Sequence, residues 1–227
     1  MKKSMKKSLL CFTLILVLIS SLIPVSETRI NASDSLVPVA IDNLDLCAVT
    51  NVKTPSPLKR SYLVPNASGY MRVSFDNERK KIWIEDYNDK FMITSKRSLD
   101  LELDLWGGFY AGDDAYYIAE GQNNTEENNN KEVIRIIKYD HNWKRLGAAS
   151  VKRDLVVAEN SVRYPFDASS CDMIEHKGKL YLVSGHEGYV DSKYGQGHQG
   201  FLMVEVDPSS MTGRFISWDQ SPSFIQF

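Results

Sequence analysis

The segment AYYIAEGQ, residues 115–122, sets the fold class, because a related segment, KLYLVSGH, recurs at residues 179–186. A turn precedes each copy and a polar loop follows it. Beyond each loop lies an apolar run that ends in aspartate: VIRIIKYD at residues 133–140 and FLMVEVD at residues 201–207. Short runs rich in β-branched and aromatic residues, divided by turn residues, predict strands. We interpret the two copies as one group of strands used twice.

Further runs of this kind surround the two copies, and nothing after residue 40 shows a sustained helical period. The expected strands cover residues 69–76, 80–87, 90–96, 107–111, 115–121, 132–139, 145–151, 170–175, 179–185, 201–206 and 214–218. Units of four short antiparallel strands that recur at about 40–60 residues are typical of propeller blades. The sequence therefore predicts an all-β fold: a partial β-propeller of about three four-stranded antiparallel blades, after an N-terminal signal helix.

The expected blades cover residues 69–98, 106–152 and 167–218. A closed propeller needs about four to eight blades, and residues 221–227 resemble the first strand of another one. We therefore expect a truncated propeller whose complete form continues with further blades. The alternative is a β-sandwich in which the similarity between hairpins is accidental.

The first residues predict export. Four lysines among the first eight residues precede an apolar run at residues 9–25, and a polar stretch of small residues follows. This order is typical of a secretory signal, whereas a membrane anchor needs about 20 apolar residues. We assign residues 1–32 to a signal peptide and short linker, with a retained anchor as the alternative. Residues 33–68, rich in proline, are expected to be irregular. The expected location is secreted or on the extracytoplasmic face of the cell envelope.

Composition narrows the class of partner. The chain has 227 residues, is 43% hydrophobic and 25% charged, and carries a formal charge of −2. These proportions fit a globular domain and give no basis for nucleic-acid binding. Beyond the signal, Cys47 and Cys171 either form a bridge or are two buried thiols, and we favour the thiols.

Candidate ligand-binding residues gather where loops are expected to meet. In a blade, the loop that joins the second and third strands opens on the same face as the loop that enters the first strand. Exposed aromatic residues there, such as Trp106 and Tyr189, would stack on sugar rings. We interpret the loop at residues 123–131 as a solvated hairpin tip. The residues expected on this face are Trp106, Gln122, Asn123, Phe166, His186, Glu187, Tyr189, His198 and Gln199.

No established catalytic motif is present. The sequence lacks the Gly-x-Ser-x-Gly elbow, the phosphate-binding loop and the dinucleotide fingerprint. His186, Glu187 and His198 supply zinc-type ligands, but their spacing fits no established metal motif, so we expect no metal and no cofactor. We predict an exported, non-catalytic recognition module for a carbohydrate, cell-surface or protein partner. The alternatives are a secreted hydrolase or transferase that uses these three residues at the propeller mouth, and a nonfunctional gene remnant.

Several strings carry a family resemblance: WGGFYAG at residues 106–112, YY at 116–117, GQNN at 121–124, KEVIR at 131–135 and PFDA at 165–168. Together with the His186-Glu187 and His198-Gln199 pairs, they resemble a group of secreted, functionally uncharacterised β-propeller-like proteins of Gram-positive bacteria. The resemblance covers residues 69–227. It implies a propeller-like fold, export and, because such proteins are usually longer, truncation. It implies no reaction.

Overall fold

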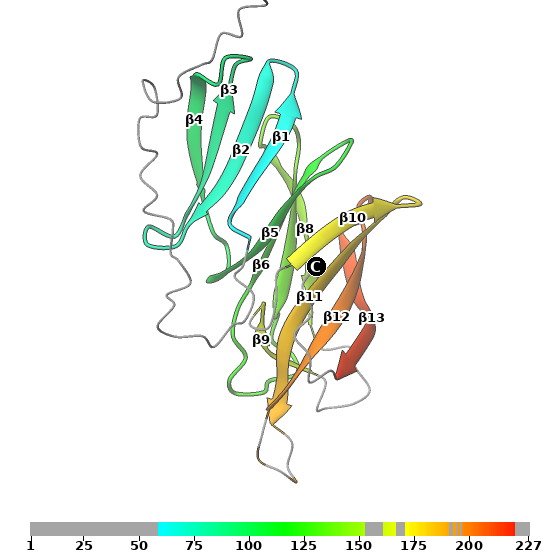
Figure 1. The fold of residues 1–227 in the computed structure, drawn as a ribbon. Helices are drawn as coiled ribbons and strands as arrows, with labels where there is room; N and C mark the ends of the chain where they lie inside the picture. Colours follow the sequence, from blue (N-terminus) through cyan, green and yellow to red (C-terminus); the bar gives the residue numbers. More distant parts are fainter. Residues whose placement is uncertain are drawn as a thin grey trace, which may run out of the picture. The chain divides into compact units, whose positions relative to one another are not determined.

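The computed structural model describes residues 59–152, 161–166, 171–190, 193, 195 and 197–220. Within these ranges every regular element is a β-strand (Figure 1). The predicted all-β class is confirmed. No helix in the described ranges is long and apolar enough to cross a membrane. The predicted signal peptide, most of the predicted irregular segment and the strand expected at residues 221–227 lie outside the described residues.

The strands form three antiparallel sheets, and within each sheet neighbours along the chain pair with one another. The first sheet contains β1 (Ser61–Asn66), β2 (Gly69–Asp76), β3 (Lys81–Tyr87) and β4 (Ile93–Asp100). The second contains β5 (Leu105–Ala111), β6 (Tyr116–Gly121), β7 (Ile134–Tyr139) and β8 (Arg145–Val151). The third contains β10 (Cys171–His176), β11 (Lys179–Val190), β12 (Gly197–Asp207) and β13 (Thr212–Gln220), with β9 (Val162–Pro165) paired to the far end of β11.

The sheets correspond to the three predicted units, with two differences. Strand β1 lies in the segment that we expected to be irregular because of its prolines. Pro65 is nevertheless part of β1, paired with Tyr70 of β2. An edge strand tolerates proline because a missing N–H on its unpaired side breaks no ladder hydrogen bond. The second difference is β9, which extends the third sheet beyond four strands.

The second sheet lies between the other two and buries both of its faces. In β6, Ile118 packs against the first sheet, whereas Tyr117 and Ala119 pack against the third. In β7, Ile136 and Ile137 divide in the same way. Alternate strand residues point to opposite faces, so a strand covered on both sides needs apolar residues at nearly every position. This explains the continuous apolar character of the run from Ala115 to Ala119.

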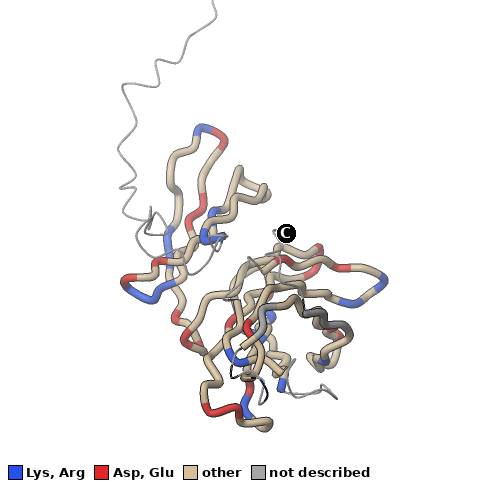
Figure 2. The backbone as a smooth tube through the Cα atoms, turned by 60° about the horizontal axis from the view of Figure 1, so that its bottom comes forward, with Lys and Arg blue, Asp and Glu red and all other residues tan. Residues whose placement is uncertain are grey.

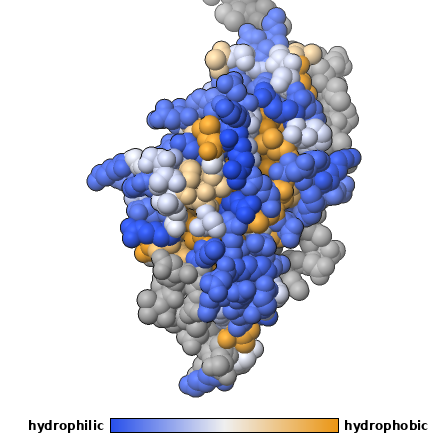
Figure 3. Space-filling view, turned by 180° about the vertical axis from the view of Figure 1, so that it is seen from behind, coloured by the Kyte–Doolittle hydropathy of each residue, from blue (hydrophilic) through white to orange (hydrophobic). Residues whose placement is uncertain are grey.

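Charged residues of both signs are mixed along the described strands and turns (Figure 2). Seen from behind, hydrophilic residues cover most of the described surface, and hydrophobic ones form separate groups between them (Figure 3). This surface carries no single-sign field of the kind that steers a strongly charged polymer.

Candidate functional site

The loop between β6 and β7 is attached to the third sheet through Asn124, which is only 1% exposed. Its Nδ2 donates to the hydroxyl of Tyr189 at 2.8 Å, and its Oδ1 accepts the backbone N–H of Asn128 at 3.0 Å. Its backbone N–H donates to the carbonyl of Arg163 at 2.8 Å. Buried amides are stable only when their hydrogen bonds are made. The loop that we interpreted as a solvated tip is therefore anchored at its base.

A cluster of three charged side chains lies beside this anchor. Arg163 of β9 is 3.9 Å from Glu127 of the loop (Nε to Oε1) and 3.7 Å from Glu187 of β11 (Nη1 to Oε1). Both separations exceed hydrogen-bond length, so the guanidinium lies between the carboxylates without a bidentate pair to either. Glu127 also accepts the backbone N–H of Val190 at 2.9 Å. We call Glu127, Arg163 and Glu187 the charged trio.

Gly197 makes room for the trio. A Cβ on Gly197 would lie 2.5 Å from Oε1 of Glu187, which is closer than real Cβ atoms come to another atom. The three charged side chains are between 23% and 33% exposed. The guanidinium can donate to a polar ligand, and the two partly desolvated carboxylates beside it can accept from the same ligand. The trio therefore suits hydroxyl-rich or amide-rich ligands.

Three of the predicted site residues lie in the interior instead. Trp106 is 2% exposed; its Nε1 donates to the carbonyl of Lys59 at 3.0 Å, and its ring stacks on Phe75 at 5.4 Å. Phe166 is 3% exposed, and its ring would meet a Cβ placed on Gly107. His186 is also 3% exposed. None of these three side chains could stack on or coordinate a ligand at the surface.

The expectation of exposure also fails at Tyr189, which is 6% exposed and bonded to Asn124. Trp106 and Tyr189 lie within strands β5 and β11 rather than in the loops where we expected them, and a β-bulge interrupts each strand. The register shifts between Trp106 and Gly108 in β5, and again after Glu187 in β11. An extra residue at a bulge changes the direction of the side chains that follow, so simple alternation no longer predicts their face.

The remaining predicted residues lie at the end of the sheets where the β6–β7 loop and β9 are found, which we call the loop end. Gln122 is half-buried, and its Nε2 donates to the carbonyl of Glu132 at 2.9 Å, while Asn123 is exposed. Gln199 pairs with Glu187 across β11 and β12, and His198 precedes it in β12. The side chains of His198 and Gln199 lie outside the part of the chain that the structure describes. Of the predicted set, Gln122, Asn123 and Glu187 therefore retain side chains near the surface of this end.

His186 is chemically isolated in its place on β11. Neither ring nitrogen has a hydrogen-bond partner within the described part of the chain. Burial lowers the pKa of its imidazole to about 4, so the ring is neutral at physiological pH. A neutral, enclosed imidazole cannot exchange protons with a substrate at the surface. No three His, Cys, Asp or Glu side chains group into a metal site in the described ranges.

Sequence reasoning missed the anchor and two of the three charged residues. Asn124 stands among several asparagines, and nothing in the sequence distinguishes it from Asn123 or Asn128. Arg163 belongs to β9, whose partner is a distant part of the chain. The one available signal was general: asparagine side chains favour hydrogen bonds to nearby backbone in loops.

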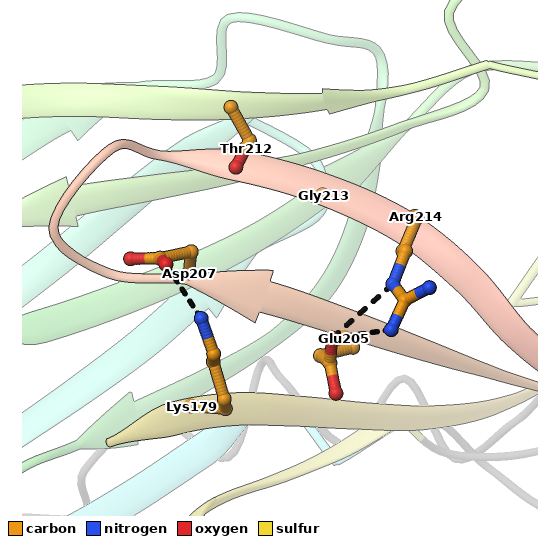
Figure 4. A pocket seen from close by; sticks show the side chains of 6 residues that line it. All are labelled: Lys179, Glu205, Asp207, Thr212, Gly213 and Arg214. Atoms are coloured by element: carbon orange, nitrogen blue, oxygen red, sulfur yellow. Dashed lines mark hydrogen bonds and ion pairs between the residues drawn. The ribbon is translucent and has the colours of Figure 1, made fainter.

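A hollow lies on the outward face of the third sheet, away from the loop end. It measures about 250 Å³ and is lined by Lys179, Glu205, Asp207, Thr212, Gly213 and Arg214 (Figure 4). Lys179 pairs with Asp207, and Arg214 pairs with Glu205 at 3.0 Å. Each charge in this hollow already faces an opposite charge on the neighbouring strand. We interpret it as cross-strand pairing on a solvated face.

Cys171, the cysteine within the described residues, agrees with the prediction of a buried thiol. Cys171 in β10 is 3% exposed and carries a free thiol, and burial raises its pKa well above the usual range. Such a thiol is inert. Cys47 lies outside the described residues.

Comparisons with known proteins identify no family. No family model matches the sequence, and no curated protein matches it significantly. Among solved structures, a crystal structure of an ACO/RPE65 chimera is similar with a TM-score of 0.40 and 10% sequence identity. The similarity covers 72% of this chain and 38% of that chain. A likeness this weak carries no argument about function.

Proposed function

We propose that this chain is an exported, partial β-propeller that recognises a carbohydrate at its loop end and catalyses no reaction. The sequence of the first residues supports export. Three meander sheets, with the second packed between the first and the third, support the propeller interpretation. The observation that carries the proposal is the charged trio, which Asn124 and Gly197 hold half-buried beside a loop of polar residues.

Carbohydrate is the partner that suits this surface best. Sugar hydroxyl groups both donate and accept hydrogen bonds, and the trio offers a donor between two acceptors. Exposed Asn123, Thr125 and Asn130 add amide and hydroxyl groups to the same loop. The alternative, a hydrolase or transferase that uses His186, Glu187 and His198, is less well supported because the imidazole of His186 is enclosed.

Calorimetric titration with neutral glycan and peptidoglycan fragments tests the proposal. We expect the wild-type chain to bind a fragment, and Arg163→Gln and Glu187→Gln to weaken binding by about tenfold or more, because each removes a charge-assisted hydrogen bond. Arg214→Gln is the matched control, since it removes an arginine–glutamate pair on an outward face and should bind normally. Absence of binding by the wild type, equal binding by all variants, or turnover of a fragment would each refute the proposal.

A further inference from the structure

The first sheet has an outward face on which apolar side chains remain exposed. Four of the seven large hydrophobic residues that are exposed in the described ranges belong to this sheet or its turns: Leu63 at 60%, Phe91 at 61%, Met92 at 64% and Ile93 at 56%. The opposite face of the sheet carries Met71, Val73 and Ile84 and packs against the second sheet. Clustered apolar exposure of this kind marks interaction sites more often than scattered single residues do.

The turn between β3 and β4 holds Phe91 outward. The side chain of Asn88 accepts the backbone N–H groups of Lys90 at 3.0 Å and Met92 at 2.9 Å. Phe91 has a φ of 57°, a left-handed conformation that is unfavourable for a bulky residue. Strained backbone of this kind tends to occur at functional sites. Here the strain presents an aromatic ring to solvent.

Phe91 stacks on Tyr70 of β2, with ring centroids 4.9 Å apart and planes inclined by 10°. One face of Phe91 is thus covered by Tyr70, while the ring as a whole stays 61% exposed. Tyr70 pairs across the strands with Tyr87, and Tyr87 pairs with Ile93. Directly opposed residues share a face of the sheet. The result is an aromatic platform made of Tyr70, Tyr87 and Phe91.

Charged groups border the platform on the same face. Glu85 is 6% exposed and accepts the hydroxyl of Tyr87 at 3.0 Å. Arg72 and Lys96 both pair with this carboxylate, at 3.3 Å and 2.8 Å. Two cations on one carboxylate leave one positive charge in excess. The Nζ of Lys96 also lies 4.5 Å from the ring centre of Trp83.

We propose that this outward face of the first sheet binds an acidic oligosaccharide, with the sugar ring on the Tyr70–Phe91 stack and its carboxylate beside Arg72 and Lys96. The C–H face of a sugar ring is apolar and covers an aromatic face, which removes apolar surface from water. A carboxylate on that ring matches the excess positive charge. A membrane surface would bury the exposed apolar residues Phe91, Met92 and Ile93. It would not require the charged network around Glu85, which lies behind them. This surface is separate from the loop end and does not depend on the function proposed for it.

Titration with oligogalacturonate, followed by tryptophan fluorescence and calorimetry, tests the inference. We expect wild-type binding that weakens with added salt, and weaker binding of the matched neutral oligogalactoside. Phe91→Asn should reduce affinity by about tenfold, because the stacking ring is lost. Asparagine tolerates the left-handed conformation, so this variant keeps the turn. Lys96→Gln should reduce binding of the acidic ligand more than binding of the neutral one.

Two control variants distinguish this surface from the rest of the molecule. Leu146→Ala removes an exposed leucine from β8, and Arg214→Gln removes an exposed arginine from β13. Both positions lie outside the first sheet and outside the loop end, so both variants should bind oligogalacturonate as the wild type does. Loss of binding in Arg163→Gln would assign the ligand to the loop end and overturn the inference. Equal affinity of Phe91→Asn and wild type, no binding by the wild type, or binding only to vesicles of equimolar phosphatidylcholine and phosphatidylserine would also overturn it.

Discussion

Glu120 shows how one residue makes stability depend on pH. Its side chain is fully buried on β6, where Oε2 accepts the backbone N–H groups of Glu102 at 2.7 Å and Leu103 at 2.9 Å. Oε1 has no hydrogen-bond partner in the described part of the chain. Burial raises the pKa of Glu120 from 4.5 to about 7, although the two backbone hydrogen bonds oppose the shift. Through these two hydrogen bonds, Glu120 holds the segment between β4 and β5 against the second sheet.

The sign of the pH dependence follows from this raised pKa. Between pH 4.5 and about 7 the unfolded chain releases the proton of Glu120 while the folded chain keeps it. The free energy of unfolding contributed by this group is therefore fully present below pH 4.5, falls as pH rises, and levels off above pH 7. We expect the free energy of unfolding of the wild type, minus that of Glu120→Gln, to fall by at most about 3 kcal/mol over this range. Urea unfolding at several pH values measures it.

Measuring the difference rather than the wild type alone is necessary. Hydrogen bonds and ion pairs from Arg145 and Arg135 hold the pKa of Glu102 below its usual range despite partial burial. Such carboxylates lose stabilising interactions as pH falls, which is the opposite slope. They are common to both chains and cancel in the difference. A difference that does not change between pH 4.5 and 7 would show that Glu120 titrates normally.

At the scale of an element, the β6–β7 loop is expected to depend on one buried amide. Asn124→Ala removes the amide that donates to the hydroxyl of Tyr189 and accepts the N–H of Asn128, at a cost of about 1–3 kcal/mol. We also expect faster hydrogen exchange in residues 122–133, measured by mass spectrometry. Asn130→Ala, at an exposed position of the same loop, should change stability by less than about 0.5 kcal/mol. Equal effects of the two substitutions would mean that Asn124 does not anchor the loop.

The strands of the sheets were largely predictable because their signals are local. Asp76, Asp140 and Asp207 each accept backbone N–H groups in the turn that follows a strand, and this chemistry is readable from sequence. Strand β9 was not predictable, because four residues gain their structure only by pairing with the distant end of β11. Strand β1 was missed because Pro65 indicates a break unless the strand is known to lie at an edge.

The site was less predictable than the fold, for a related reason. Which end of the sheets carries the loops follows from strand order, and Gln122, Asn123 and Glu187 lie at that end. Whether a side chain there faces solvent depends on bulges and on the neighbouring sheet. Trp106 and Tyr189 are of the residue types that stack on sugar rings when exposed. Each is instead in contact with a residue from another part of the chain.

At the scale of the whole molecule, the second sheet depends on its two neighbours for the burial of its faces. Both of its faces are apolar, and each is buried by a different sheet. Exposing either face would cost about 25 cal/mol for every Å² of apolar surface returned to water. The described sheets should therefore unfold together, although each is a local meander.

Substitutions on the two faces of the second sheet test this cooperativity. Ile118→Ala opens a cavity toward the first sheet and Ile136→Ala toward the third; both isoleucines are fully buried. Each should lower the free energy of unfolding by about 2–5 kcal/mol. Because all three sheets share one transition, each variant should shift the same unfolding curve in urea, by tryptophan fluorescence and by circular dichroism alike. Ile174→Ala, on an exposed position of β10, should shift it by less than about 0.5 kcal/mol. If Ile118→Ala instead divides the unfolding curve into two transitions, the first sheet unfolds separately. The three described sheets would then not form one cooperative unit.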